Sequence, residues 1–192
     1  MLIAIVMIVL AAGYRVVAAW EPSLANFAPL MALTFCAGVY FRDRRLWVVP
    51  FVALVVSDVY LDNYYATQYG YHWSIGGAVI RALCFVVALY LGRLVSRQKT
   101  WLNLFSGALG GAVIFYLVTN TQTWGSDLAY AKTFAGWWQA MTVGHPEFPP
   151  TLVFFRNTLA SDLFFTAAFV LVMEYRALRH AEPSLLGRRQ AA

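Results

Sequence analysis

The sequence SIGGAVIRALCFVVALYLGRLV occupies residues 74–95 and is a long, clearly apolar stretch of the chain. A helix needs about 20 mostly apolar residues to cross the hydrocarbon core of a membrane. This stretch meets that length, and its charged residues are Arg81, inside it, and Arg93, close to its end. The stretch is therefore predicted to form a transmembrane helix.

The composition of the whole chain agrees with a membrane environment. Of its 192 residues, 61% are apolar and only 12% are charged, whereas about a quarter of the residues in a soluble domain are charged. The net charge of +5 does not indicate a nucleic-acid partner, because the basic residues form short clusters between apolar segments, as topology signals do. The chain length favours a single domain.

Further segments are apolar enough, and nearly long enough, to be membrane helices. They lie at about Leu2–Ala19, Phe27–Phe41, Leu46–Leu61, Leu102–Val118 and Thr151–Met173. Tryptophan favours the headgroup zone, so a short interfacial helix is predicted at 132–143. The predicted fold is an all-α membrane protein with about six transmembrane helices in residues 1–176, followed by a basic, solvated tail at 177–192.

The positions of lysine and arginine predict the orientation. Basic residues gather after the second, fourth and sixth predicted helices, at Arg42, Arg44, Arg45, Arg93, Arg97, Lys99, Arg176, Arg179, Arg188 and Arg189. The opposite loops contain one basic residue, Lys132. Because cytoplasmic loops carry the excess of basic residues, both termini are predicted to be cytoplasmic in a multi-pass protein of the bacterial inner membrane.

Charged residues inside the predicted helices are the most informative feature. They are Arg15, Asp58, Arg81, Arg156 and Asp162, and each costs about 2.5–3.5 kcal/mol to insert unless it has a partner or an aqueous cavity. The first four map to the outer half of the membrane and the last lies nearer the middle. Arg81 and Arg156 are predicted to lie near acidic side chains, with Asp58 and Asp162 as candidates, or near an anionic ligand group.

Two interpretations of these residues stay open: structural ion pairs that bind nothing, or an outward-open polar pocket for a small molecule. Aromatic rings with a few convergent polar groups are typical of small-molecule sites, although an ordinary aromatic belt explains part of the pattern. The candidate ligand-binding residues are Asn26, Asp58, Tyr71, His72, Arg81, Asn120, Trp124, Arg156, Asn157 and Asp162.

Catalytic and metal-binding motifs are not found in the sequence. It has no phosphate-binding glycine loop, no H-E-x-x-H and no G-x-S-x-G. Neither an enzymatic activity nor a cofactor or metal is therefore expected. A lone histidine such as His72 is more simply a solvated side chain than a metal ligand.

Several motifs resemble a small bacterial membrane family without an assigned function. They are Asn26-Phe27-Ala28-Pro29, Ser57-Asp58 and the run Phe155-Arg156-Asn157-Thr158-Leu159 followed by Asp162-Leu163. The architecture also resembles the substrate-binding S-components of energy-coupling factor vitamin transporters. That likeness implies a vitamin or cofactor precursor as ligand, and an energising transporter module as partner.

The first helix departs from the S-component pattern. A small-x-x-x-small motif on helix one commonly docks the coupling subunit in that family, whereas this chain reads Ala4-Ile5-Val6-Met7-Ile8. A carrier that works alone fits this departure. The alternative is a non-catalytic accessory subunit of a larger membrane protein complex, and a membrane-embedded enzyme is a third hypothesis.

Overall fold

The computed structural model describes residues 2–21, 24, 27–69, 74–146 and 148–187. Its helices are α1 (Leu2–Ala18), α2 (Leu30–Tyr40), α3 (Val48–Tyr69), α4 (Ile75–Val95), α5 (Trp101–Ser126), α6 (Phe134–Met141) and α7 (Thr151–Arg179), with short 3-10 turns η2 (Arg44–Trp47) and η3 (Ser96–Gln98). The described residues contain no strand. The all-α prediction is confirmed, and every predicted helical segment has a helix.

The lengths of the helices differ from the prediction of six membrane spans. The helices that contain α3, α4, α5 and α7 are long and apolar enough to cross a membrane, so the architecture is that of a helical membrane protein. α1 has 17 residues and α2 has 11. At about 1.5 Å per residue, α2 is about 16 Å long, roughly half the thickness of a hydrocarbon core.

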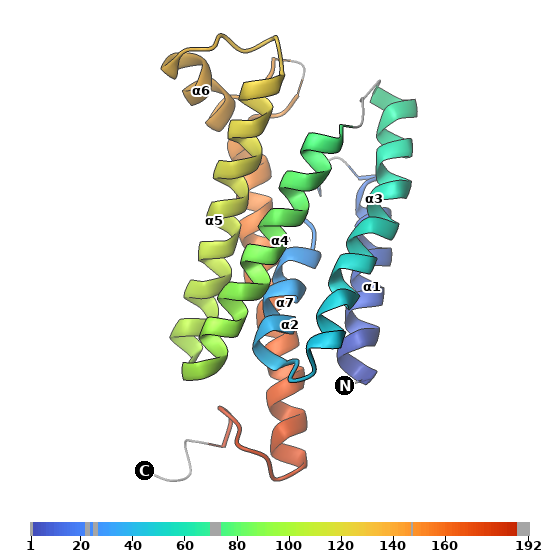
Figure 1. The fold of residues 1–192 in the computed structure, drawn as a ribbon, viewed down its shortest axis with the longest axis vertical. Coiled ribbons are helices and arrows are strands. Elements are labelled where there is room, and N and C mark those ends of the chain that lie inside the picture. Colours follow the sequence, from blue (N-terminus) through green and yellow to red (C-terminus); the bar gives the residue numbers. More distant parts are fainter. Residues whose placement is uncertain (1, 22–23, 25–26, 70–73, 147, 188–192) are drawn as a thin grey trace.

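α2 is a half-length helix in the interior of the bundle. Figure 1 shows it in the lower half of the molecule, between the longer helices, with its first turn about midway along the bundle. All residues of α2 from Leu30 to Gly38 are buried. A helix that is apolar on every side is stable only when other helices surround it, and α2 packs mainly on α4 and α7.

Glycines permit this dense packing. A Cβ atom on Gly38 would lie 2.1 Å from the backbone oxygen of Leu89, and one on Gly92 would lie 2.0 Å from that of Phe35. The α2 and α4 backbones therefore meet directly, as small residues allow in membrane helices. Gly107 of α5 faces the Phe35 ring, so this glycine serves internal packing.

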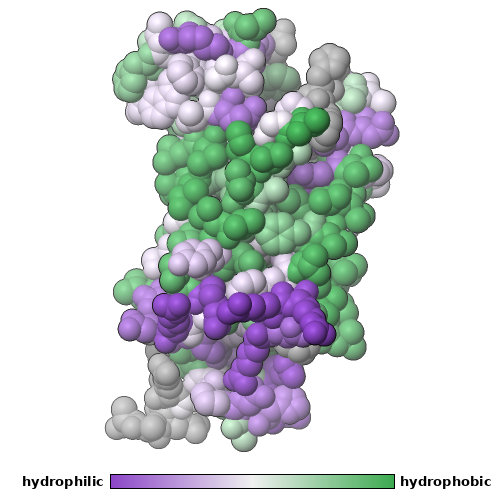
Figure 2. All heavy atoms as spheres, in the orientation of Figure 1, coloured by the Kyte–Doolittle hydropathy of each residue, from purple (hydrophilic) through white to green (hydrophobic). Residues whose placement is uncertain are grey.

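The surface has the polarity of a protein embedded in lipid. In Figure 2, apolar residues dominate the middle of the visible face and hydrophilic residues gather at both ends. On α3, the exposed valines Val48, Val52, Val55, Val56 and Val59 form one stripe, because residues three and four apart share a helix face. α1 begins and α7 ends at the same end of the bundle (Figure 1).

The start of the predicted tail is not fully solvated. α7 continues to Arg179, and the chain then folds back so that Leu185 is buried. Its amide donates to Glu174 Oε2 at 2.7 Å, while Tyr40 and Lys99 donate to Oε1 at 2.7 and 2.5 Å. Glu174 is completely buried, and it holds α2, the α4–α5 connection and the tail on α7.

Candidate functional site

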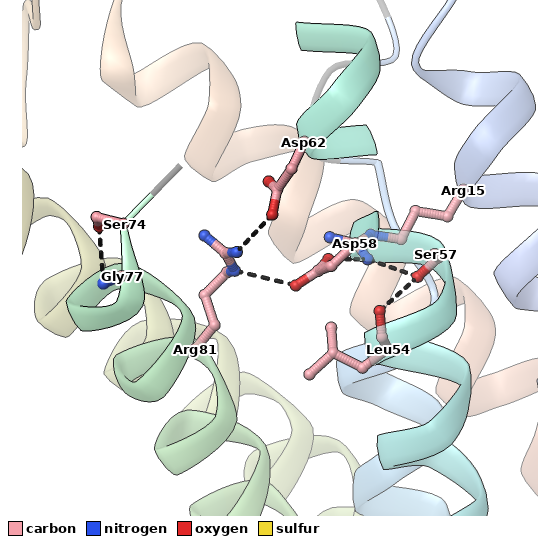
Figure 3. Close-up of polar contacts among 8 residues, drawn as sticks. All are labelled: Arg15, Leu54, Ser57, Asp58, Asp62, Ser74, Gly77 and Arg81. Atoms are coloured by element: carbon pink, nitrogen blue, oxygen red, sulfur yellow. Dashed lines mark hydrogen bonds and ion pairs between the residues drawn. The ribbon is translucent and has the colours of Figure 1, made fainter. Parts of the chain in front are cut away.

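Four charged side chains from three helices meet in the half of the bundle nearer to α6 (Figure 3). Asp58 of α3 lies between two arginines: Arg15 Nη1 of α1 is 2.5 Å from Oδ1, and Arg81 Nε of α4 is 3.2 Å from Oδ2. Arg81 Nη2 also lies 3.6 Å from Asp62 Oδ2. The prediction that Arg81 lies near Asp58 is confirmed.

The geometry of α3 explains this charge cluster, which consists of Arg15, Asp58, Asp62 and Arg81. Asp58 and Asp62 are four residues apart and therefore share a helix face. Arg15 Nη1 also donates to Ser57 Oγ at 2.7 Å, which fixes its position beside Asp58. Two positive and two negative groups balance, so the cluster has no formal net charge when all four are ionised.

A large cavity lies between α4, α5, α7 and the chain that joins α5 to α7. Its volume is about 590 Å³, within the range of about 300–1,000 Å³ that holds small ligands. Hydroxyl and amide groups line it at Ser74, Thr119, Asn120, Gln122, Thr123, Ser126, Thr151 and Thr158, and aromatic rings at Phe115, Tyr116, Tyr130, Phe148, Phe154 and Phe155. We call it the outer cavity, after the side of the membrane on which the sequence predicts this end of the bundle to lie.

The periodicity of α5 creates one wall of the outer cavity. Its lining residues Tyr116, Thr119, Asn120 and Thr123 recur at intervals of three and four, so they share one face of the helix. The Asn120 amide donates to the Tyr116 carbonyl at 2.8 Å, which holds the side chain against its own helix. The Tyr116 hydroxyl in turn donates to the carbonyl of Met141 in α6.

Arg81 connects the charge cluster to the outer cavity. It lines that cavity, a smaller one of about 140 Å³ that Arg15 also lines, and a groove of about 420 Å³ beside Asp58 and Asp62. The arginine is thus held by carboxylates on one side and faces the outer cavity on the other. Such a group can bind a ligand acceptor without moving, because its position is already fixed.

The structure separates the sequence-predicted site residues. Arg81 and Asn120 line the outer cavity, and Asp58 lines the groove between α3 and α4. Trp124 lines none of these three cavities, and its Nε1 donates to the Ala131 carbonyl at 2.9 Å. Asn157 and Asp162 are buried within the bundle. Asn26, Tyr71 and His72 lie outside the described residues.

Arg156 requires a correction. It was predicted to join the polar groups of the outer half and to lie near an acid or an anionic ligand group, yet its side chain is exposed and lines none of the three cavities. Its Nη2 donates to Asn157 Oδ1 at 3.3 Å. No ion pair with an acid is found for it in the described part of the chain, and Asp162 lies buried away from it.

Several lining residues come from the irregular chain between α5 and α7, and two of them, Tyr130 and His145, were not predicted as site residues. Tyr130 is buried. Its burial, and to a smaller extent the nearby Asp127 carboxylate, raises the pKa of its hydroxyl. Tyr130 is therefore neutral at physiological pH and has a hydroxyl hydrogen to donate. His145 packs edge-on against the Tyr130 ring, and both residues line the outer cavity.

The chain belongs to a family of unknown function, DUF6580, which matches it over residues 1–185. The predicted membership of a family without an assigned function is thereby confirmed. No curated protein and no solved structure matches the chain. A function therefore has to be argued from the site itself.

Proposed function

We propose that the chain is a membrane carrier that takes up a small molecule, such as a vitamin or cofactor precursor, through the outer cavity. The observation that supports this proposal best is the cavity itself, which combines a ligand-sized volume with hydroxyl, amide and aromatic groups from three helices. Aromatic rings supply contact area in such sites, while a few polar groups orient the ligand.

The ionisable residues favour a neutral or dipolar ligand. Arg81 already pairs with Asp58 and Asp62, so the cluster needs no counter-charge from outside. Most other polar lining groups are hydroxyls and amides, which recognise hydrogen-bonding patterns rather than net charge. A compound with several hydroxyl, carbonyl or ring-nitrogen groups fits this lining.

The distribution of basic residues supports uptake from outside the cell. Arg42, Arg44 and Arg45 follow α2, whereas Arg97 and Lys99 follow α4. These ends lie opposite to α6 and the outer cavity (Figure 1). With the basic end in the cytoplasm, both termini are cytoplasmic and the cavity faces outward, in the inner membrane of a bacterium.

Two features of α1 favour a carrier that works without an S-component-type coupling subunit. The small residues Ala4 and Ala11 are buried against the bundle. The outer face of α1 instead exposes the bulky residues Leu2, Val6 and Val9. A small-residue surface for a coupling subunit is therefore not presented by this helix.

Ligand-induced stabilisation tests the proposal. A compound that binds the folded protein at 100 times its Kd raises the free energy of unfolding by about 2.7 kcal/mol. We expect at least one member of a panel of vitamins and cofactor precursors to raise the melting temperature of the purified protein. The Thr123→Trp variant, which places a bulky indole ring at the wall of the outer cavity, is expected to lose this response.

The Val118→Trp variant is the matched control. Val118 lies on the same helix, is exposed and does not line the outer cavity, so this variant is expected to retain the response. If no compound stabilises the wild type and a second protein co-purifies in equal amount, the accessory-subunit hypothesis replaces the carrier.

A further inference from the structure

A buried carboxyl group lies where α7 meets the first turn of α2. Asp162 is 2% exposed. Neither of its carboxyl oxygens forms a well-aligned hydrogen bond. The hydroxyl of Thr166, one turn further along α7, is also buried and lies beside the Cys36 thiol. Threonines elsewhere on the helices, such as Thr34 and Thr158, instead donate to a carbonyl of their own helix.

The surroundings of Asp162 contain no cation to neutralise it. Its titratable neighbour on α2 is the Cys36 thiol, which is also fully buried. On the α1 side, Tyr14 packs its ring on Phe165. Among the described residues, no charged side chain interacts electrostatically with the carboxyl group. A carboxylate without a nearby cation is strongly disfavoured in an apolar interior, which favours the protonated acid.

The N-terminus of α2 makes the ionised form accessible as well. α2 begins inside the bundle after Pro29, and the backbone amide of Ala32 in its first turn approaches the carboxyl. The N-terminus of a helix carries a partial positive charge and unsatisfied N–H groups, which stabilise an anion. One side of the site thus favours the acid, and the other favours the carboxylate.

The position of Asp162 links it to the outer cavity. Thr158 lines both the outer cavity and the small cavity of about 140 Å³, and it lies one helical turn before Asp162. Ala28, Leu30 and Met31 also line the small cavity, at the first turn of α2. The two cavities are therefore neighbours that meet at Thr158, and the smaller one reaches the start of α2 near the carboxyl.

We infer that Asp162 is a proton-binding site supplied from the outer cavity, where a proton is taken up and released in step with transport. The coupling to transport rests on the proposed carrier function, but the proton site itself does not. Uptake converts the carboxylate to the carboxylic acid, and release returns the proton to water. Intramembrane carboxyl groups in carriers and pumps serve as such proton relays.

Infrared spectroscopy of the protein in nanodiscs tests the proton site without any ligand. We expect a carboxylic-acid C=O band at neutral pH that is lost in Asp162→Asn and kept in Asp43→Asn, whose carboxyl is exposed between α2 and η2. The band should shift after transfer to D₂O and disappear as the pH rises. If Asp162→Asn does not fold, the wild-type protein with ¹³C-labelled aspartate carboxyls shows by the isotope shift whether the band comes from an aspartic acid. Asp62→Asn and Asp127→Asn in the same labelled protein then exclude two other aspartates near the outer cavity.

Three results would overturn parts of this inference. No aspartic-acid band at neutral pH would mean that Asp162 holds no proton. A band that neither shifts in D₂O nor changes with pH would mean that Asp162 is a buried acid with a purely structural role. Equal D₂O exchange rates in Thr123→Trp and Val118→Trp would refute the route through the outer cavity, since filling that cavity is expected to slow exchange at least several-fold. None of these readouts depends on whether the compound panel yields a ligand.

Discussion

Gly38 of α2 faces the carbonyl oxygen of Leu89 in α4 so closely that the two backbones touch, since a Cβ on Gly38 would lie 2.1 Å from that oxygen. The atom in the way belongs to the backbone and cannot rotate aside. Gly38→Ala is therefore expected to push α2 away from α4, at a cost of about 1–3 kcal/mol as in other overpacked cores. A melting curve in detergent measures the loss.

Gly110→Ala in α5 is the control for this substitution. A Cβ at Gly110 meets nothing within 4 Å, and alanine favours a helix over glycine by about 1 kcal/mol. The variant is expected to be as stable as the wild type or slightly more stable. Equal melting temperatures for the two variants would show that α2 and α4 are not in direct contact.

The two carboxylates of the charge cluster are expected to differ in their contribution to stability. Asp58→Asn removes the partner of Arg15 at 2.5 Å and of Arg81 at 3.2 Å, whereas Asp62→Asn removes a single contact at 3.6 Å. Breaking a buried pair costs about 3–5 kcal/mol. The loss in Asp58→Asn should be smaller than this, because the cluster is partly exposed.

The loss in Asp62→Asn should be about 1 kcal/mol or less, as for pairs near the surface. Thermal unfolding of the two variants side by side measures the difference. A larger loss for Asp62→Asn than for Asp58→Asn would contradict the assignment of Asp58 as the centre of the cluster.

Glu174 and Lys99 are expected to be energetically coupled. Lys99 Nζ lies 2.5 Å from a carboxylate that is completely buried, so Lys99→Met leaves Glu174 with only its neutral donors. Glu174→Gln is also expected to destabilise the protein. The double variant should lose less than the sum of the two, with a coupling of about 0.5–3 kcal/mol. If the stability losses of the two single variants simply add in the double variant, the ion pair between Lys99 and Glu174 is refuted.

Thiol labelling tests the orientation in the membrane. Gln68 and Ser126 are exposed at the outer ends of α3 and α5, and Gln98 is exposed in η3 at the basic end. An impermeant thiol reagent added to whole cells should label cysteines at the first two positions but not at Gln98. Wild-type protein is the control, because Cys36 and Cys84 are buried. Labelling only of the cysteine that replaces Gln98 would mean that the basic end faces outward, contrary to the proposed topology.

Arg156→Ala is expected to leave ligand-induced stabilisation unchanged. The side chain is exposed and lines none of the three cavities, although the sequence made it a candidate ligand residue. The same compound panel that tests the cavity-filling variant measures this one. Loss of the response in Arg156→Ala, with the melting temperature otherwise unchanged, would place the ligand elsewhere.

The sequence predicted those features that depend on composition and on the cost of a charge in lipid. α4 was predicted at 74–95 and lies at Ile75–Val95, and the pairing of Arg81 with Asp58 follows from the need to neutralise both. α2 was predicted as a span from 27 to 41, but apolar composition does not fix helix length. The helix begins only after Pro29, because a proline disfavours the helical conformation of the residue before it.

Two features limited the prediction of the site. They are the directions in which side chains point around α7 and the irregular chain between α5 and α7. Asn157 and Ser161 are four apart and both face the interior, so Arg156, about 100° around the helix from Asn157, points outward. Conversely, Tyr130 and His145 enter the outer cavity from the connection between α5 and α7. Periodicity cannot place residues in such a segment, because they follow no helical repeat.

The half-length α2 also has a consequence for biosynthesis. Its 11 residues are too few to cross a bilayer unaided, and its main packing partners, α4 and α7, lie later in the chain. During synthesis at the ribosome, α1 to α3 therefore enter the membrane before the main packing partners of α2 have been made. Completion of the fold must wait for the last helix, and a chain truncated before residue 151 is expected to be recognised and degraded by membrane proteases.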